Sequence, residues 1–447
     1  MMKKILIGIA LMVAGSTFAQ SGLDQTATEI AAQMAPGWNL GNTLEGARTW
    51  AVTWENPQRP AVEVFTNDGG LESETVWQST KTTQEVIDFV KSQGFRSIRI
   101  PCAWVWGHIA DAENYTIDAA WMARVREIVD YCINDGLYVM LNDHYDGGWM
   151  ENHIADNDEA TKVKNREVLR AIWTQIATEF RDYDEHLLFA GMNEPNADTQ
   201  AATNNLIEYE QVFIDAVRAT GGNNEKRILI IQGPNTDVDK TCQYMNTLPK
   251  DIIEGKLAIE VHYYNPWPFC GMTTDEAWGR QAFYWGTANH VRGSNRNSSS
   301  NEAEMRAMLG KMKEKFVDKG YPVILGEYGA NWREITDTGQ SQEKHDVSIR
   351  SYYHTLNELS REMGIVPMAW DTNQTSRPNT TIIDRNALTV FNQPAMDGIA
   401  KSVQPTSIKD LIHKSTAKDG IYTLSGIRIE NPKKGLYIVN GRKVLFK

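Results

Sequence analysis

The chain has 447 residues, of which 41% are hydrophobic and 23% are charged, and this composition is typical of a globular protein with a large core. Its formal net charge of −12 excludes nucleic-acid binding through phosphates and favours a neutral ligand over a polyanion. The 14 Trp, 16 Tyr and 12 Phe are the unusual feature, because tryptophan rings suit flat, partly polar ligands.

The N-terminal residues 1–19 are predicted to be a secretory signal peptide. Lys3 and Lys4 precede an apolar stretch and a small-residue cleavage site that ends at Ala19. The apolar stretch is too short to span a membrane, and no later segment is long enough either. We therefore expect a secreted or cell-surface protein that begins at Gln20 and has no membrane span.

Eight apolar runs that resemble buried strands alternate with helical patterns along most of the chain. Most runs lack a polar–apolar alternation, as expected of strands that are buried on both faces. The runs are Gly37–Asn42, Phe95–Pro101, Leu137–His144, Leu187–Glu194, Arg227–Gly233, Leu257–Tyr264, Tyr321–Gly329 and Gly364–Asp371. Helices are predicted over Thr83–Gly94, with a cap at Thr82 and Thr83, and over Asp118–Gly136, Lys162–Tyr183, Leu206–Gly221, Ser300–Gly320 and Gln342–Gly364.

This alternation predicts an α/β fold, a (β/α)8 TIM barrel, over residues 20–402. A doubly wound open sheet is the competing architecture, but it usually has a Gly-rich nucleotide-binding turn after a strand, and the chain has none. The polar residues favour the barrel, because the carboxyl ends of barrel strands meet on one face. Polar or aromatic side chains at those ends are Arg99, His144, Asn193, Glu194, His262, Tyr264, Glu327 and Trp370.

Two glutamates stand out among these residues. Glu194 follows the apolar residues 187–189 and Glu327 follows 323–325, so each is an ionisable group at the end of a buried strand. Such a group is costly unless it faces a cleft. One carboxylate of this kind is commonly an ordinary charged residue at a strand end. Two carboxyl groups on one barrel face, however, are what enzymatic cleavage of a glycosidic bond requires.

The loop over residues 265–300 is long and rich in aromatic side chains. We expect it to form a small core of its own and also one wall of the substrate cleft. Trp267 is nearest the strand end and is therefore the expected platform for a sugar ring.

The cysteines predict neither a disulfide framework nor a metal site. Four cysteines in so long a chain are too few for such a framework, and no spacing of Cys and His resembles a zinc site. Cys242 and Cys270 fall in loops that are neighbours in the predicted barrel, so a disulfide between them is an open alternative to two free thiols.

The character of the chain changes near Ser402. Residues 403–418 are polar and basic and are predicted to be a linker, and residues 419–447 are predicted to form short strands with a hairpin turn at Asn440–Gly441. Residues 403–447 carry nine basic and three acidic side chains. Because three short strands are marginal alone, this tail is too small for the chemistry. We expect it to act in export or surface attachment, through the secretion machinery; the alternative is a hairpin that packs on the barrel.

Five short motifs follow one another over about residues 30–400: Gly37–Leu44, Ile98–Pro101, Asn193–Pro195, His262–Tyr264 and Gly326–Gly329. Together they resemble glycoside hydrolase family 5, the cellulase family. The tail resembles the C-terminal sorting domains of secreted Bacteroidota proteins. The family resemblance implies a retaining hydrolysis of a β-glycan with no metal and no organic cofactor.

The resemblance also implies a role for each site residue. Glu194 would protonate the leaving glycosidic oxygen and later deprotonate a water, while Glu327 would attack the anomeric carbon; retention requires their carboxyl groups to lie about 5–5.5 Å apart. Arg99 and Tyr264 would hydrogen-bond Glu327 and keep it ionised. The remaining matches are Asn193 at the sugar 2-hydroxyl, His144 and His262 beside the reacting sugar, Trp370 beneath it, and Asn42 in the substrate-binding motif. Tyr145 stands where many relatives have a second histidine, so that contact is open.

The substrate is expected to be a β-1,4-glucan that is cut internally. The motif Gly37–Leu44 is commonest among family members that cut cellulose or related glucans. Xyloglucan, mixed-linkage glucan and mannan are alternative substrates, because loop shape decides substrate choice. A non-catalytic glycan-binding barrel is the alternative from another class of protein, and the presence of both glutamates argues against it.

Overall fold

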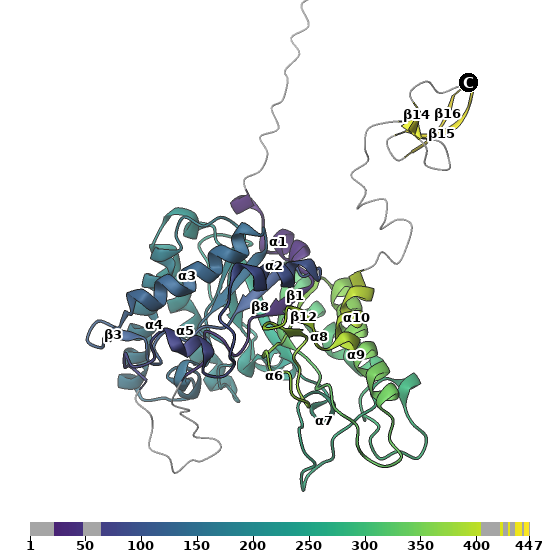
Figure 1. Ribbon diagram of the computed structural model, residues 1–447. Coiled ribbons are helices and arrows are strands. Elements are labelled where there is room, and N and C mark those ends of the chain that lie inside the picture. The colour runs from purple at the N-terminus through teal and green to yellow at the C-terminus, as the bar shows by residue number, and fades with distance from the viewer. Residues whose placement is uncertain are drawn as a thin grey trace, which may run out of the picture. The chain divides into compact units, whose positions relative to one another are not determined.

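The computed structural model describes residues 22–47, 64–403, 421–422, 428–429, 434–439 and 442–446 (Figure 1). The predicted signal peptide, the predicted linker beyond Val403 and the Asn440–Gly441 turn lie outside these residues. Among the described helices, none combines the length and the hydrophobicity that a membrane span needs. The chain divides into two compact units. The first comprises Met1–Tyr263, Gly310–Tyr328 and Gly364–Thr372, and the second Tyr264–Leu309, Gly329–Met363 and Asn373–Lys447.

A closed barrel of eight parallel strands forms the first unit, which confirms the predicted (β/α)8 fold. Each strand is shorter than the apolar run that predicted it. The strands are β1 (Gly37–Asn39), β2 (Ser97–Ile100), β5 (Tyr138–Asn142), β6 (Leu187–Ala190), β7 (Leu229–Gln232), β8 (Leu257–Tyr263), β9 (Val323–Tyr328) and β10 (Ile365–Ala369). Their order around the barrel is β1-β10-β9-β8-β7-β6-β5-β2. The short hairpins β3 (Ile109–Asp111) with β4 (Thr116–Ile117) and β11 (Ile383–Asp384) with β12 (Thr389–Val390) lie outside it.

All the predicted helices are present, with shifted ends. The helices are α1 (Ala27–Met34), α2 (Gln84–Ser92), α3 (Ala119–Asn134), α4 (Glu159–Glu179), α5 (Gln200–Ala219), α6 (Val238–Tyr244), α7 (Trp267–Cys270), α8 (Glu302–Lys315), α9 (Gln342–Met363) and α10 (Gln393–Val403). Side-chain caps set several of the starts: Asp158 caps α4 and Thr199 caps α5, six residues before the predicted start. The predicted cap of α2 is confirmed at Thr83, which is the N-cap residue, although its side chain makes no cap bond.

The inward faces of the strands change character along the barrel. Residues two apart on a strand face the same side. Met140, Ile230, Ala258 and Met368 belong to one buried apolar cluster, which α1 completes with Ile30 and Met34 among others. Two residues further along the same four strands stand Asn142, Gln232, Glu260 and Trp370, and four residues past Ala258 stands His262. The barrel is therefore filled by apolar side chains toward one end and by polar ones toward the carboxyl ends of its strands.

The second unit contains α7, α9 and α10 and the long loop after β8. Phe283, Tyr284 and Trp285 of this loop are buried, and Phe283 and Trp285 pack against His345 and Tyr352 of α9, so the core that the loop enters includes this helix. Trp267 and Trp278 are 50% and 68% exposed. The disulfide between Cys242 and Cys270 is not formed, and all four cysteines are free. Cys270 is buried and its thiol lies 3.2 Å from the hydroxyl of Tyr352 instead.

The described part of the tail is a four-stranded antiparallel sheet, one strand more than predicted. Its order is β14-β13-β15-β16, with β13 (Ile421–Tyr422), β14 (Arg428–Ile429), β15 (Gly435–Val439) and β16 (Arg442–Phe446). In the pair β15–β16, Val439 pairs with Arg442.

Candidate active site

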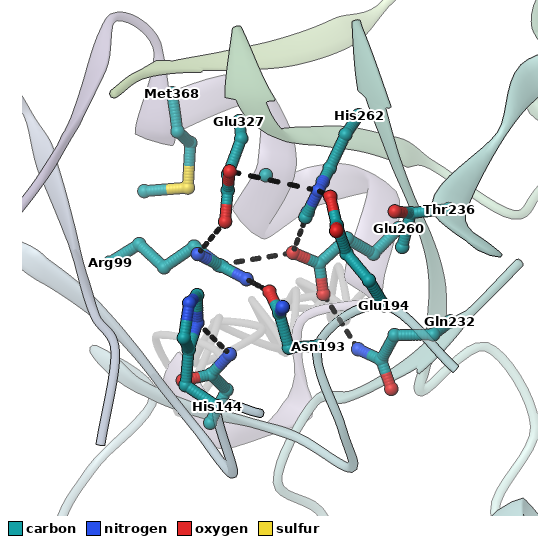
Figure 2. A network of polar contacts seen from close by, with 12 residues as sticks. Arg99, His144, Asn193, Glu194, Gln232, Thr236, Glu260, His262, Glu327 and Met368 are labelled. Atoms are coloured by element: carbon teal, nitrogen blue, oxygen red, sulfur yellow. Dashed lines mark hydrogen bonds and ion pairs between the residues drawn. The ribbon is translucent and has the colours of Figure 1, made fainter. Parts of the chain in front are cut away.

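Arg99 is the centre of a polar network at the carboxyl ends of the strands (Figure 2). Its side chain is fully buried in β2. Its Nη1 donates to Oε1 of Glu327 at 3.0 Å and to Oδ1 of Asn39 at 3.1 Å. Its Nη2 donates to Oδ1 of Asn193 at 2.8 Å. Because Asn193 accepts from Arg99 through its oxygen, its amide NH2 points away from the guanidinium and is oriented as a donor.

The two glutamates of the predicted pair share one histidine. Nδ1 of His262 lies 2.7 Å from Oε1 of Glu194 and 3.8 Å from Oε2 of Glu327. One carboxylate oxygen of each glutamate and one nitrogen of His262 all lie within 4.8 Å of one another. That spacing is compatible with the short separation of retaining glycosidases and leaves too little room for the water that an inverting enzyme needs between its carboxylates.

The two glutamates differ in their surroundings. The side chain of Glu327 is 8% exposed and bonded to Arg99, while that of Glu194 is 46% exposed. Glu327 lies inside β9, whereas Glu194 lies four residues beyond the last residue of β6. The arrangement therefore holds one carboxylate against a cation inside the barrel and leaves the other open to solvent.

A third carboxylate, Glu260, was missed by the sequence reasoning. It lies in β8 with no exposed side-chain surface, and its Oε1 is 3.0 Å from Nε of Arg99 and 3.2 Å from Nε2 of His262. Gln232 donates to its other oxygen at 2.6 Å. The available signal was the two-residue spacing from His262, which puts both side chains on one face of the strand.

These carboxylates set the charge of His262. Burial alone would lower the pKa of this histidine, but Glu327, Glu194 and Glu260 raise it to about 10, so the ring is an imidazolium at neutral pH. Burial would likewise raise the pKa of Glu260, but the charge of Arg99 and the bond and charge of His262 bring it below its usual value. Two cations and up to three carboxylates thus form one network, of which all but Glu194 are buried.

His144 and Trp370 stack on each other, with ring centroids 5.7 Å apart and planes 7° apart. Burial and the charges of Arg99 and His262 hold the pKa of His144 well below its usual value, so this ring is neutral. The ring of Trp370 packs against Gly41, where an added Cβ would lie 2.9 Å from it. Tyr145 packs edge-on against Trp106, with centroids 6.1 Å apart.

For three predicted residues, Asn42, Tyr264 and Trp267, the expected contacts stay predictions. Asn42 has a φ of 57°, and its backbone N–H bonds to Glu45, next to the Gly41 that supports Trp370. Tyr264 and Trp267 belong to the second unit, so the bond of Tyr264 to Glu327 and the sugar platform at Trp267 stay predictions.

Glu151 is a second residue that the sequence reasoning missed. Its Oε1 accepts the backbone N–H of Glu194 at 2.7 Å, and its carbonyl accepts the N–H of Asn196 at 3.1 Å. Burial, with a contribution from the charge of Glu194, raises the pKa of Glu151 to about 7. It belongs to a short 3-10 helix (Glu151–His153), and no sequence pattern connects it to Glu194.

Known proteins resemble this chain over most of its length. Residues 61–376 match the family described as Cellulase (glycosyl hydrolase family 5). The xyloglucan-specific endo-beta-1,4-glucanase BoGH5A of Bacteroides ovatus is 34% identical, over 85% of this chain and 71% of that protein. Endoglucanase A of Ruminococcus albus is 32% identical, over 85% of this chain and 94% of that protein. Among solved structures, XEG5B is a GH5 xyloglucan-specific beta-1,4-glucanase from a ruminal metagenomic library, solved in complex with XXLG. It is 42% identical with a TM-score of 0.74, over 85% of this chain and 96% of that one.

Proposed function

The chain belongs to the cellulase family, glycosyl hydrolase family 5, and is an endo-β-1,4-glucanase; we propose that it cleaves xyloglucan with retention of configuration. The observation that carries the retaining chemistry is the close approach of Glu194, His262 and Glu327. One carboxylate oxygen of each glutamate and one ring nitrogen of His262 lie within 4.8 Å of one another. The xyloglucan preference is supported by the relatives BoGH5A and XEG5B, both described as xyloglucan-specific.

In the first step, Glu327 attacks the anomeric carbon and the bond from that carbon to the glycosidic oxygen breaks. Arg99, whose Nη1 lies 3.0 Å from Oε1, pairs with the Glu327 carboxylate and holds it in place for this attack. Glu194, the more exposed carboxyl group, gives its proton to the leaving oxygen. The NH2 of Asn193, oriented by Arg99, donates to the sugar 2-hydroxyl.

In the second step, the roles of the same groups reverse. Glu194, now ionised, takes a proton from a water, whose oxygen attacks the anomeric carbon. The bond between that carbon and Glu327 breaks, and Glu327 returns to its carboxylate form. Trp370, stacked on the neutral His144, offers a flat face to the sugar ring.

Release of reducing sugar from a panel of polysaccharides tests this function. The panel consists of xyloglucan, carboxymethylcellulose, lichenan, xylan and mannan. We expect the highest kcat/KM on xyloglucan and no turnover by Glu194→Gln. Higher activity on carboxymethylcellulose or lichenan would contradict the substrate and leave the mechanism standing, whereas binding of the panel without turnover would identify a non-catalytic barrel.

We also propose that the protein is exported and that residues 403–447 address it to the secretion machinery or the cell surface. The support is the basic tail with its own small sheet, which offers no candidate catalytic group.

A further inference from the structure

Glu260 is placed between the two cations of the site (Figure 2). Its Oε1 touches both Nε of Arg99 and Nε2 of His262, and these two side chains in turn touch Glu327 and Glu194. Glu260 therefore reaches both proposed catalytic glutamates through one intermediate each. The steps proposed for the reaction give it no role of its own.

The Glu260 carboxylate packs directly against Gly326, which has no side chain to displace it. A Cβ added to Gly326 would lie 1.8 Å from Oε1 of Glu260. Any other residue at that position would displace the carboxylate, so the backbone directly before Glu327 packs on Glu260. On the other side, Gln232 joins Glu260 to the strand end that leads to Glu194. Its Nε2 donates to Glu260 at 2.6 Å and its Oε1 accepts the N–H of Met192 at 2.8 Å.

The charges of the network show why a third carboxylate matters. With Glu260 and Glu327 ionised, the two anions balance Arg99 and His262, and Glu194 can hold a proton without leaving a net charge. Without the charge of Glu260, two cations would face Glu327 alone and would favour an ionised Glu194. An ionised Glu194 cannot protonate a leaving group.

We propose that Glu260 is a positioning residue for this reaction. It is a buried anion that fixes the side-chain positions of Arg99 and His262 and balances their positive charge. The charged and polar groups that contact it are Arg99 of β2, Gln232 of β7 and His262 of β8, and its charge also reaches Glu210 of α5. The proposal rests on the roles given to Glu194 and Glu327 and is independent of which β-glucan is cut.

The first test compares Glu260→Gln with a control variant, using an activated aryl β-cellobioside and xyloglucan as substrates. Glu260→Gln keeps the shape and removes the charge. Because loss of a negative charge weakens proton binding by every neighbour, both limbs of the pH profile of kcat/KM should move to lower pH by on the order of one unit. The value of kcat at the wild-type optimum should fall by about tenfold.

The matched control is Asp251→Asn. Asp251 pairs with Arg218 at 2.5 Å, with both side chains 4% exposed, near the start of β7. This variant also loses a buried ion pair, so its Tm should fall while its pH profile stays in place. An unmoved profile in Glu260→Gln together with a similar loss of Tm would reduce Glu260 to a packing role and overturn the proposal.

A second measurement does not depend on the folding of that variant. Nitrogen-15 NMR of the wild-type enzyme should show His262 as an imidazolium up to about pH 10, with the signal assigned by its loss in His262→Gln. Gly326→Ala, which displaces the carboxylate, should bring the titration to lower pH. Titration of wild-type His262 near its ordinary pKa would contradict the proposal. Failure on xyloglucan with intact turnover of the aryl cellobioside would count against the substrate alone.

Discussion

Oε1 of Glu194 lies 2.7 Å from Nδ1 of His262, so the proposed acid is hydrogen-bonded to an imidazolium. The same nitrogen is 3.8 Å from Glu327. The ring of His262 therefore contacts Glu194 and lies close to Glu327. In a double displacement Glu194 must act first as an acid and then as a base, while Glu327 acts first as a nucleophile and then as a leaving group.

Glu327→Ala should be rescued by azide, and the product should have the inverted anomeric configuration, because the small anion attacks from the vacated face. Glu194→Ala should instead keep fast glycosylation of activated aryl glycosides, whose leaving group needs no proton. Product NMR and pre-steady-state kinetics distinguish these two behaviours. If the two phenotypes were exchanged, the roles of Glu194 and Glu327 would be the reverse of those proposed.

Glu151→Ala should lower kcat by about tenfold to a hundredfold with a smaller change in KM. The variant removes the acceptor of the Glu194 backbone N–H, and a small displacement of the acid costs this much. Glu151→Gln keeps an acceptor oxygen and should recover most of the activity. Steady-state kinetics on an aryl β-cellobioside check this, and equal losses in the two variants would show that the charge of Glu151, rather than its hydrogen bond, is what matters.

The Tm of Glu210→Gln, relative to that of the wild type, should be higher at pH 8 than at pH 4.5. Burial raises the pKa of Glu210 to about 8, with a contribution from Glu260, although Gln232 donates a backbone N–H to it. Between about pH 4.5 and pH 8 the folded wild-type protein therefore keeps a proton on Glu210 that the unfolded chain has lost. The free energy of unfolding of the wild type consequently falls over this range, by on the order of a few kcal/mol. Melting curves of both proteins at the two pH values test this, and the same Tm difference at both would contradict it.

Trp267→Ala and Trp278→Ala should each raise KM on xyloglucan by about threefold to tenfold and leave kcat unchanged. Both rings are largely exposed, and an aromatic platform of this kind contributes about 0.5–1.5 kcal/mol. Ile252, 78% exposed, offers the control Ile252→Ala, which should change neither constant. Unchanged KM values for both tryptophan variants would remove them from the substrate-binding surface.

A chain that ends at Val403 should keep its kcat and its Tm. The helix α10 ends at this residue, and the basic tail beyond it is proposed to act in export. Activity and melting measurements on purified protein with and without the tail decide the matter. A loss of several degrees in Tm, or insoluble expression, would show that the barrel depends on the tail.

The sequence by itself determined the barrel and the pair of glutamates. Strands buried on both faces are continuous apolar runs, so all eight were visible without knowledge of their neighbours. A polar group that ends such a run is conspicuous, and Glu194 and Glu327 were found in this way. Helix starts were less certain, because a local cap such as Thr199 decides them and several residues in a loop can serve.

Only the tertiary structure decided which charges meet. Glu260 stands inside an apolar run, and nothing in its neighbourhood along the chain connects it to Arg99 of β2. The closure of the barrel brings the two within 3.0 Å. The charge of His262 depends on the same closure, because the pKa of a buried group follows from its desolvation and from the charges around it. Both quantities are set by residues that are distant in the chain, and for that reason the sequence could name the histidine but not its protonation.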